Sequence, residues 1–252
     1  MPPDTKAMTS RLELQDVRSG YGRMEVLHGM TLAIEPGEFV AVVGANGAGK
    51  SVLLKTVAGI LKCWDGTIRF GGKTVSGLRA SEVQGSGVTF IPQSAITFPR
   101  MSVEENLRMG AFVESDRTVL ARRFEQVYAL APELFELRKR LAGNLSGGQQ
   151  KMLALGRALM SEPELLLFDE PSIGLDPKAL DRVFTKLREL NAQGLTVVLV
   201  EQNVRMALKV ASRAVLLELG NLRFSGTPAE LLADEALERA YFGVRQDPVP
   251  VS

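Results

Sequence analysis

Residues 44–51 have the types and the spacing of a loop that binds phosphate groups. They read Gly-Ala-Asn-Gly-Ala-Gly-Lys-Ser, follow the apolar run from Phe39 to Val43 and precede a helical pattern over residues 52–58. Glycines let successive backbone N–H groups turn inward around phosphates, the lysine supplies a cation, and the serine hydroxyl can bind Mg²⁺. The loop predicts a triphosphate ligand, against the alternative of an ordinary glycine-rich turn between a strand and a helix.

The ligands expected in this loop are backbone N–H groups and one ammonium for the phosphates, with one hydroxyl for the metal. The residues concerned are Gly44, Asn46, Gly47, Gly49, Lys50 and Ser51. Val52 follows Ser51 at a position where a second hydroxyl would be able to touch phosphate. A contact at Val52 must therefore come from its backbone or be absent.

Two acidic residues, Asp169 and Glu170, follow the apolar run of residues 165–168. A carboxylate at the end of a buried strand can hold Mg²⁺ or its waters, and the neighbouring carboxylate can orient an attacking water. The pair therefore favours phosphoryl transfer to water. The alternative is two exposed acids at the end of a strand.

A second glycine-rich segment precedes a helical pattern further along the chain. It reads Leu-Ser-Gly-Gly-Gln over residues 145–149. Amide donors and a serine hydroxyl at the start of a helix form an anion-binding surface at the positive end of the helix dipole. One nucleotide is unable to use both glycine-rich segments unless the fold brings them together.

The elements that must hold these residues alternate between strands and helices. Apolar runs predict buried strands at residues 39–43, 88–91, 165–168 and 196–200, with helices between them. Such an order implies an α/β fold with a mainly parallel sheet, which binds ligands at its C-terminal edge. Alternating patterns at residues 12–17 and 30–34, around a turn at Tyr21-Gly22, predict an N-terminal antiparallel pair, and a short strand is predicted at residues 67–70.

Helical patterns fill residues 93–160, where no strand-like run occurs. Ser102 and Glu105 have the spacing of a capping box, and helices are expected at residues 117–130, 133–141 and 149–160. We interpret this segment as an α-helical subdomain inserted into the α/β core.

Composition excludes several other classes of protein. The chain has 252 residues, a formal net charge of +1, one cysteine (Cys63) and one histidine (His28). Near-neutral charge argues against nucleic acid as a partner, and a single cysteine excludes an internal disulfide. The sequence has no apolar run long enough to span a bilayer and no apolar signal segment at its start. One compact unit in the cytosol is expected.

From about residue 12 to residue 243, the sequence resembles the ATP-binding cassette family of transporter ATPases. The segment from Leu145 to Gln149 is similar to the family's signature motif, in which Ser146, Gly147, Gly148 and Gln149 complete the ATP site of a facing subunit. The resemblance implies a P-loop NTPase core at about residues 10–92 and 161–226, a helical subdomain at 93–160 and a C-terminal helix at 227–243. These parts would form one domain over residues 10–244, with flexible termini at 1–9 and 245–252.

Three further residues match the family's pattern. Tyr21 matches the aromatic residue that stacks on adenine, Gln93 the glutamine that senses Mg²⁺ and the attacking water, and Asp176 the aspartate of a loop that crosses the dimer interface. Taken alone, Gln93 would be a surface loop residue. Asp176 is also expected to cap the helix that starts at Pro177.

The chain departs from the family's pattern after residues 196–200. Relatives usually have a histidine there that contacts the γ-phosphate, whereas this chain has Glu201, Gln202 and Asn203. His28 is expected in the segment that joins the first two strands, so it is no substitute. We predict that Gln202 is a neutral sensor of the γ-phosphate, since its amide can donate a hydrogen bond but cannot exchange a proton.

The same departure favours one branch of the family. Residues 201–203, together with residues 101–107 and 231–235, look like the ATPases of branched-chain amino-acid importers, whose relatives serve urea and short amides. This resemblance implies ATP and Mg²⁺ as ligands, a head-to-tail dimer with an identical chain or a paralogue, transmembrane permease subunits, an extracytoplasmic solute-binding protein and a place on the inner face of the membrane. The permeases would dock near Gln93 and the apolar stretch of residues 94–101, which includes Phe98. The alternative is that Phe98 and Met101 pack against the helical insertion. The alternative from another class is a soluble cassette ATPase acting on nucleic acid or ribosomes.

Overall fold

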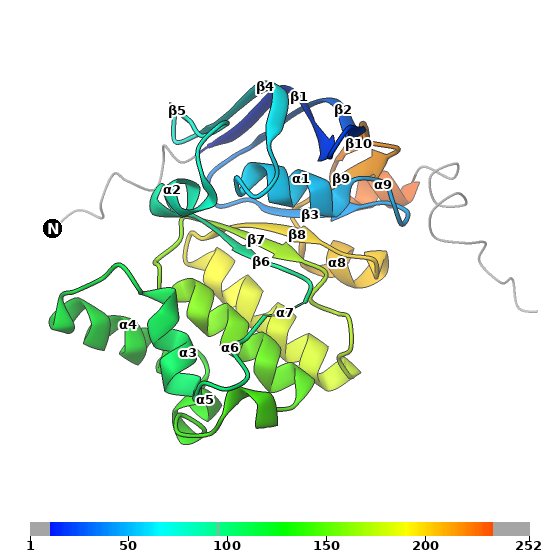
Figure 1. Cartoon of the computed structure of the whole chain (residues 1–252). Coiled ribbons are helices and arrows are strands. Elements are labelled where there is room, and N and C mark those ends of the chain that lie inside the picture. The colour runs from blue at the N-terminus through cyan, green and yellow to red at the C-terminus, as the bar shows by residue number, and fades with distance from the viewer. Residues whose placement is uncertain (1–10, 95, 234–252) are drawn as a thin grey trace, which may run out of the picture.

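The computed structural model of the chain describes residues 11–94 and 96–233, which form a six-stranded and a four-stranded sheet with helices around them (Figure 1). In the larger sheet the strand order is β10-β9-β3-β8-β7-β6. The bounds in that order are Asn221–Gly226, Arg213–Glu218, Phe39–Val43, Thr196–Val200, Leu165–Asp169 and Val88–Ile91. Every neighbouring pair is parallel except β9 and β10, which confirms the predicted mainly parallel sheet.

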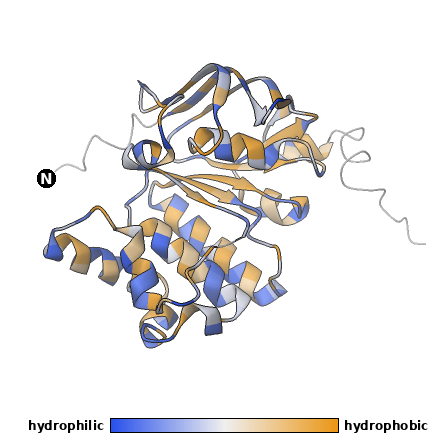
Figure 2. Cartoon of the chain, in the orientation of Figure 1, coloured by the Kyte–Doolittle hydropathy of each residue, from blue (hydrophilic) through white to orange (hydrophobic). Residues whose placement is uncertain are grey.

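The strands of this sheet are buried on both faces. In β3, Phe39, Ala41 and Val43 face one apolar core, and Val40 and Val42 face a second core on the other side. The central strands are accordingly almost wholly hydrophobic, while the surrounding helices carry one polar face (Figure 2). Sheets covered on both faces need continuous apolar strands, which explains why the sequence predicts these strands well.

Helix α1 (Lys50–Val57) lies between the two sheets and follows β3 through the predicted phosphate loop (Figure 1). Its C-cap is Ala58, and Gly59 then takes a left-handed conformation with φ of 69°. The Gly59 N–H donates to the Thr56 carbonyl at 3.1 Å. The helix therefore ends at the limit of the helical pattern predicted over residues 52–58, and a left-handed glycine follows it.

The smaller sheet is antiparallel, in the order β2-β1-β4-β5. The bounds in that order are Met24–Ile34, Leu12–Tyr21, Cys63–Phe70 and Lys73–Thr74. Strands β1 and β4 are longer than predicted because register shifts near Asp16 and Gly66 interrupt the alternation of apolar and polar residues. Asp16 has a left-handed φ of 49° at this point.

The expectation for His28 was wrong. The turn after Tyr21 is tight, so β2 begins at Met24 and His28 lies inside that strand, opposite Arg18. Its N–H donates to the Gly220 carbonyl at 3.1 Å, and its Nδ1 lies 3.2 Å from the Glu25 carboxylate.

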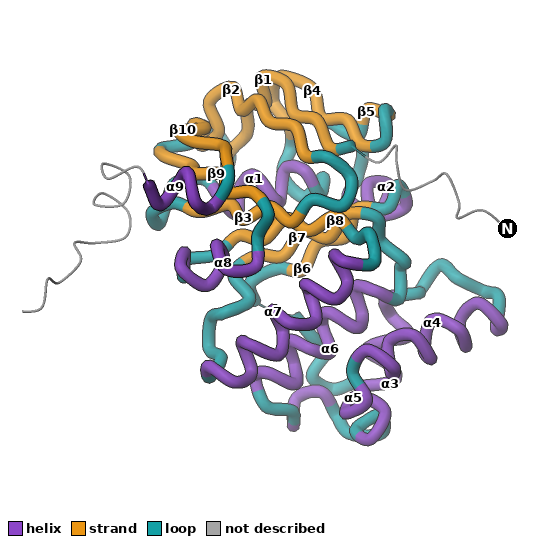
Figure 3. The backbone as a smooth tube through the Cα atoms, turned by 180° about the vertical axis from the view of Figure 1, so that it is seen from behind, coloured by secondary structure: helices purple, strands orange, loops and turns teal. Residues whose placement is uncertain are grey.

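Residues 103–159 are helical, without a strand, and pack below the larger sheet (Figure 3). The helices are α3 (Val103–Gly110), α4 (Arg117–Leu130), α5 (Pro132–Glu136) and α6 (Gly147–Leu159), with a 3₁₀ turn at Ala142–Asn144. Ser102 and Glu105 form the predicted capping box. Helix α5 ends five residues before the predicted Leu141, because the backbone of residues 138–143 turns back to bond with residues 99–104.

The remaining helices are α2 (Ala80–Gly85), α7 (Pro177–Ala192), α8 (Val204–Val210) and α9 (Pro228–Ala233). The sequence did not predict α2 or β5, which are both short and mostly exposed. The predicted C-terminal helix starts with α9, and its part beyond residue 233 lies outside the described residues, as do the termini expected to be flexible. Among the described helices, none is long and apolar enough to cross a membrane.

Candidate nucleotide site

The predicted site residues converge because four neighbouring parallel strands end at one edge of the larger sheet. In the spatial order β3-β8-β7-β6, these strands lead into residues 44–51, residues 201–203, the Asp169-Glu170 pair and Gln93. Segments that are up to 159 positions apart in the sequence therefore meet at the carboxyl edge, where open α/β sheets bind ligands.

The loop over residues 44–51 has the conformation that only glycine allows at its start. Gly44 has a φ of 148°, and a Cβ there would lie 2.3 Å from the Leu217 carbonyl oxygen. The first helical backbone bond of α1 runs from the Leu53 N–H to the Gly49 carbonyl at 2.9 Å, so the N–H groups of residues 50–52 have no acceptor within the helix. These donors at a helix N-terminus form an anion site.

Lys50 is folded back onto this loop. Its side chain is 5% exposed, and Nζ donates to the carbonyls of Gly44 at 2.9 Å and Ala45 at 3.0 Å. Burial lowers the pKa of the ammonium, against the attraction of Glu170 and Asp169, which raises it. The ammonium is thus held at the loop by weak acceptors that an anionic phosphate can replace.

Ser51 and Asp169 come into direct contact across the site. The Ser51 hydroxyl donates to Asp169 Oδ1 at 2.9 Å, and Asp169 is 2% exposed. Burial raises the pKa of the Asp169 carboxyl, and the hydrogen bond from Ser51 opposes that shift. A hydroxyl and a carboxylate side by side are oxygen ligands of the kind that Mg²⁺ accepts when substrate phosphates and waters supply the others.

Within residues 11–94 and 96–233, no group of three or more His, Cys, Asp or Glu side chains is arranged to hold a metal ion. A dedicated protein cage is therefore absent from this part of the chain, and the Ser51–Asp169 pair fits a magnesium ion that arrives with a nucleotide.

Glu170 and Gln93 are also brought together. Gln93 Nε2 donates to Glu170 Oε2 at 2.9 Å. Glu170 has a left-handed φ of 46°, and its N–H donates to the Val200 carbonyl at 2.9 Å. Non-glycine residues in this region cost about 1–3 kcal/mol, so the neighbouring structure holds Glu170 in an orientation that it would not adopt by itself.

Val52 and Tyr21 differ in the chemical groups that they can present to a nucleotide. Val52 is 5% exposed and packs in the core between the sheets, which leaves only its backbone N–H toward the loop. Tyr21 is 45% exposed at the end of β1, and its hydroxyl accepts a hydrogen bond of 3.3 Å from Lys55 of α1. The ring thus lies beside the helix that carries the phosphate loop.

The segment from Ser146 to Gln149 forms the N-terminus of α6. Ser146 and Gln149 make a reciprocal capping box, with the Ser146 N–H donating to Gln149 Oε1 at 3.0 Å. A Cβ on Gly148 would lie 2.6 Å from the Ala179 Cβ of α7, and one on Gly147 would lie 3.3 Å from the Gly174 carbonyl. The segment therefore packs on the loop and helix that follow Glu170 in the same chain.

Asp176 has the capping role that was predicted as one alternative. Its side chain accepts from the N–H groups of Lys178 and Ala179, each at 3.0 Å, at the start of α7. The residue is exposed, so the cap leaves one carboxylate face open to solvent.

Gln202 is exposed directly after β8, whereas its neighbour Glu201 is fully buried. The Glu201 carboxylate accepts from the Ser172 N–H at 2.8 Å and the Ser172 hydroxyl at 2.6 Å. Burial raises the pKa of Glu201, and the bonds from Ser172 lower it.

Two buried charges at the site were not predicted from the sequence: Glu201, which is 0% exposed, and Lys151, which is 4% exposed. The signal for Glu201 was its position directly after a wholly apolar strand, where a side chain is seldom exposed. Lys151 gave no comparable signal, since a lysine in a helix is usually on the surface.

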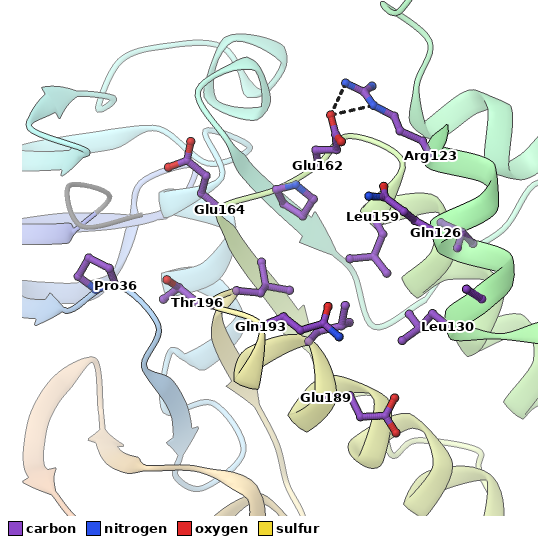
Figure 4. Close-up of a pocket in the computed structure, with 16 residues that line it drawn as sticks. Pro36, Arg123, Gln126, Leu130, Leu159, Glu162, Glu164, Glu189, Gln193 and Thr196 are labelled. Atoms are coloured by element: carbon purple, nitrogen blue, oxygen red, sulfur yellow. Dashed lines mark hydrogen bonds and ion pairs between the residues drawn. The ribbon is translucent and has the colours of Figure 1, made fainter. Parts of the chain in front are cut away.

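A cavity of about 740 Å³ lies at the opposite, N-terminal edge of the sheet. Figure 4 shows Pro36, Gln193 and Thr196 on one side of it and Gln126 and Leu130 of α4 on the other. Because this cavity lies at the N-terminal ends of the parallel strands, it is separate from the phosphate loop and the acidic pair, which lie at their C-terminal ends.

The fold and the site together define an α/β nucleoside triphosphatase with a helical insertion and a second glycine-rich segment. The family model for ABC transporter matches residues 27–173. The chain belongs to the ABC transporter family, and it is an ATPase of that family.

Relatives extend over almost the whole chain. The chain is 42% identical to the high-affinity branched-chain amino acid transport ATP-binding protein BraG of Pseudomonas aeruginosa, over 92% of this chain and 99% of that protein. It is 35% identical to the probable branched-chain amino acid transport ATP-binding protein LivF of Archaeoglobus fulgidus, over 90% and 97% of the two chains.

Among solved structures, the fold is similar to the ADP conformation of an ATP-binding cassette of an ABC transporter. The TM-score is 0.83 at 25% identity, over 93% of this chain and 99% of that one. The relatives are transporter ATPase subunits, in agreement with the predicted family and with its association with transmembrane components.

Proposed function

We propose that this chain hydrolyses ATP to drive the import of branched-chain amino acids through separate permease subunits. The observation that carries the proposal is the meeting of Ser51 with Asp169 and of Gln93 with Glu170, each at 2.9 Å, at the carboxyl edge of the larger sheet. The substrate class rests on the 42% identity to BraG over 92% of the chain. We also propose the domain limits expected from the sequence, with the core at 10–92 and 161–226 and the helical subdomain at 93–160.

The phosphate loop binds the triphosphate through its backbone donors and Lys50. Gly44, Asn46, Gly47 and Gly49 line the turn, and Val52 contributes its backbone N–H alone, because its side chain is in the core. The Lys50 ammonium exchanges two carbonyl acceptors for phosphate oxygens, which are stronger because they are charged.

Mg²⁺ would be held by Ser51 and Asp169, and Gln93 would be a further ligand. When bound, the ion neutralises charge on the phosphates. The chain's contribution is to keep a hydroxyl and a buried carboxylate in contact at the edge of the phosphate loop.

Glu170 is the group that polarises the attacking water. Its carboxylate accepts a proton from the water while the water oxygen bonds to the γ-phosphorus and ADP leaves. Gln93 Nε2 fixes one carboxylate oxygen, so the other is directed by the same contact. Gln202, exposed after β8, donates an amide N–H to the γ-phosphate and carries no charge.

The remaining predicted residues act across a head-to-tail dimer with an identical chain or a paralogue. The segment from Ser146 to Gln149 binds the γ-phosphate held by the facing subunit, through the free N–H groups at the start of α6. Asp176 lies on the neighbouring loop, and Tyr21 stacks on adenine beside α1.

The permease subunits are proposed to dock beside Gln93. Phe98 is 42% exposed there, and the Arg157 guanidinium lies 4.9 Å from its ring centre. An exposed aromatic side chain with a buried flank suits contact with an apolar partner. This contact would keep the chain on the inner face of the membrane, and a solute-binding protein would deliver the amino acid from the other side.

The test uses the chain assembled with its permeases and binding protein in proteoliposomes. Glu170→Gln is expected to lower kcat for ATP by at least about 100-fold, while ATP affinity stays within about threefold. Glu136→Gln, at an exposed position in α5, is the matched control and should keep full activity.

Leucine, isoleucine and valine should stimulate hydrolysis and be taken up. Stimulation by urea or short amides in their place would contradict the substrate class, and unchanged hydrolysis by Glu170→Gln would contradict the catalytic role.

A further inference from the structure

Lys151 is a buried cation in the second turn of α6. It is 4% exposed, its Nζ donates to the Gln93 carbonyl oxygen at 3.1 Å, and the ammonium lies 6.0 Å from the ring centre of Phe168. Burying an ammonium is costly unless polar groups compensate for lost water. Here the Gln93 carbonyl and the aromatic ring provide that compensation.

The carboxylates of the site also help to compensate for the burial of the Lys151 ammonium. Glu201, Asp169 and Glu170 all attract the Lys151 ammonium, while burial lowers its pKa. A helical residue of the inserted part is therefore bound electrostatically to the acidic edge of the sheet. This edge is where the proposed water-activating group lies.

Gln93 connects Lys151 to Glu170. Its main-chain carbonyl accepts from Lys151, and its side-chain amide donates to Glu170 at 2.9 Å. A shift of the ammonium relative to the sheet would therefore displace Gln93, and the Gln93–Glu170 hydrogen bond would lengthen or lose its alignment.

Lys151 also shares a rigid element with the glycine-rich segment. Helix α6 starts at Gly147 after its N-cap Ser146, and Lys151 follows about one turn later. The N-terminus of α6 is the proposed binding surface for the nucleotide of the facing subunit. Movement of α6 on that nucleotide is thus carried to Lys151 without an intervening loop.

We propose that Lys151 is a positioning residue that couples the two ATP sites through one chain. Through Gln93, it aligns Glu170 in this chain's own site according to the position of α6, whose N-terminus belongs to the other site. The inference rests on the proposed role of Glu170. It predicts that a movement of α6 on a facing nucleotide changes the alignment of the Gln93–Glu170 contact, which is 2.9 Å long in the single chain.

The test is a double-mutant cycle on ATP hydrolysis by the assembled transporter. Lys151→Met keeps the length and apolar stem but removes the charge and the donors. It should lower kcat about tenfold, because a hydrogen bond from a charged group is lost, and should change KM for ATP less than about twofold, because Lys50 and the loop hold the phosphates. In a Gln93→Ala background, Lys151→Met should lower kcat by less than about twofold. The side-chain amide through which Lys151 acts on Glu170 is then absent.

Two controls accompany the cycle. Lys139→Met removes the same charge at an exposed position before α6 and should leave kcat unchanged. Lys151→Arg keeps the charge and donors and should retain kcat within about threefold of the unmutated protein. Thermal unfolding and nucleotide binding of each variant are measured in parallel. If Lys151→Met does not assemble, the cycle is run with Lys151→Gln, which is neutral and one bond shorter.

Multiplicative losses in the double variant, or an unchanged kcat in Lys151→Met and Lys151→Gln, would overturn the inference. Glu170→Gln distinguishes a failure of the proposed coupling from a failure of the proposed function. If that variant is inactive and the Lys151 effects multiply with those of Gln93, only the coupling is wrong. If Glu170→Gln is active, the proposed function of the site is wrong first.

Discussion

At the scale of single residues, the site is a compact group of buried charges. The cations are Lys50 and Lys151, and the acids are Asp169, Glu170 and Glu201, all at most 9% exposed. Each charge is held by hydrogen bonds from different segments, so the group depends on the whole sheet edge. The bonds of Glu201 to Ser172 fix the chain two residues after Glu170 and thereby help to keep its left-handed backbone in place.

The raised pKa of Glu201 predicts a pH-dependent contribution to stability. Burial raises this pKa above its ordinary value of 4.5, against the bonds from Ser172. The folded state therefore keeps the proton to higher pH than the unfolded chain. The stability contributed by the group is complete below the ordinary pKa and is lost as pH rises through the folded pKa.

Glu201→Gln removes this titration. Relative to the unmutated protein, the variant should become more stable, with a larger free energy of unfolding, as pH rises above the ordinary pKa of 4.5, measured by urea denaturation. The lost hydrogen-bond acceptor adds an offset that is the same at every pH. Glu136→Gln in α5 gives the baseline. Parallel pH curves for Glu201→Gln and the unmutated protein would contradict the prediction.

At the scale of elements, the sequence predicts best where burial is complete. The strand Phe39–Val43 is apolar throughout because both faces are covered, and its bounds were predicted without error. Strands β1 and β4 were predicted too short, because Asp16 and Gly66 break their alternation at a register shift. A pattern of period two does not foresee such a shift, since the shift is set by the pairing of the two strands.

The residues of the site also differ in how well the sequence predicts them. Lys50, Ser51 and Asp169 were predicted from local spacing alone, which places the first two at the start of the helix after the glycine-rich loop and the third at the end of a buried strand. Lys151 and Glu201 were not, because their contacts, Gln93 and Ser172, lie 58 and 29 positions away. The packing of α6 against the sheet reveals the contact of Lys151, and the neighbouring ends of β7 and β8 reveal that of Glu201.

Gly148 makes a prediction about the contact between α6 and α7. A Cβ there would lie 2.6 Å from the Ala179 Cβ, whereas one on Gly147 would lie 3.3 Å from its nearest neighbour. Gly148→Ala should therefore destabilise the chain by about 1–3 kcal/mol in chemical denaturation, because two packed helices must separate. Gly147→Ala is the matched control and should cost less than about 1 kcal/mol.

Removing the opposing methyl group tests the cause of that loss. Ala179→Gly in the Gly148→Ala variant should restore stability to within about 1 kcal/mol of the unmutated chain, the remainder being the cost of glycine in a helix. A double variant that is no more stable than Gly148→Ala would show that the Ala179 contact is not responsible.

At the scale of the whole molecule, the proposed function gives each chain two unlike halves of an ATP site. The phosphate loop lies at the edge of the sheet, and the Ser146 segment lies at the start of α6, where it packs on α7. A head-to-tail pair would join the loop of each chain to the segment of the other. This arrangement is testable with variants that each inactivate one half.

Lys50→Met weakens the phosphate loop, and Gly147→Glu adds a carboxylate at the start of α6 that repels the facing γ-phosphate. The second change should not impair folding, since acids are favourable at a helix N-terminus and Gly147 is exposed there. Each variant alone should lose most of its ATPase activity. In an equal mixture, half of the pairs are mixed and have one intact site of two, so that up to about a quarter of the unmutated activity should return.

A mixture that stays as inactive as its components would contradict pairing between two copies of this chain. Each variant would then be assembled with a second cassette of the same transporter, and in that case each should lose one of its two sites. Recovery in the mixture, with none when two preparations of Lys50→Met are combined, requires that a loop and a segment from different chains meet. Since no single chain in that mixture has both halves intact, the recovered hydrolysis can only come from a site shared between subunits.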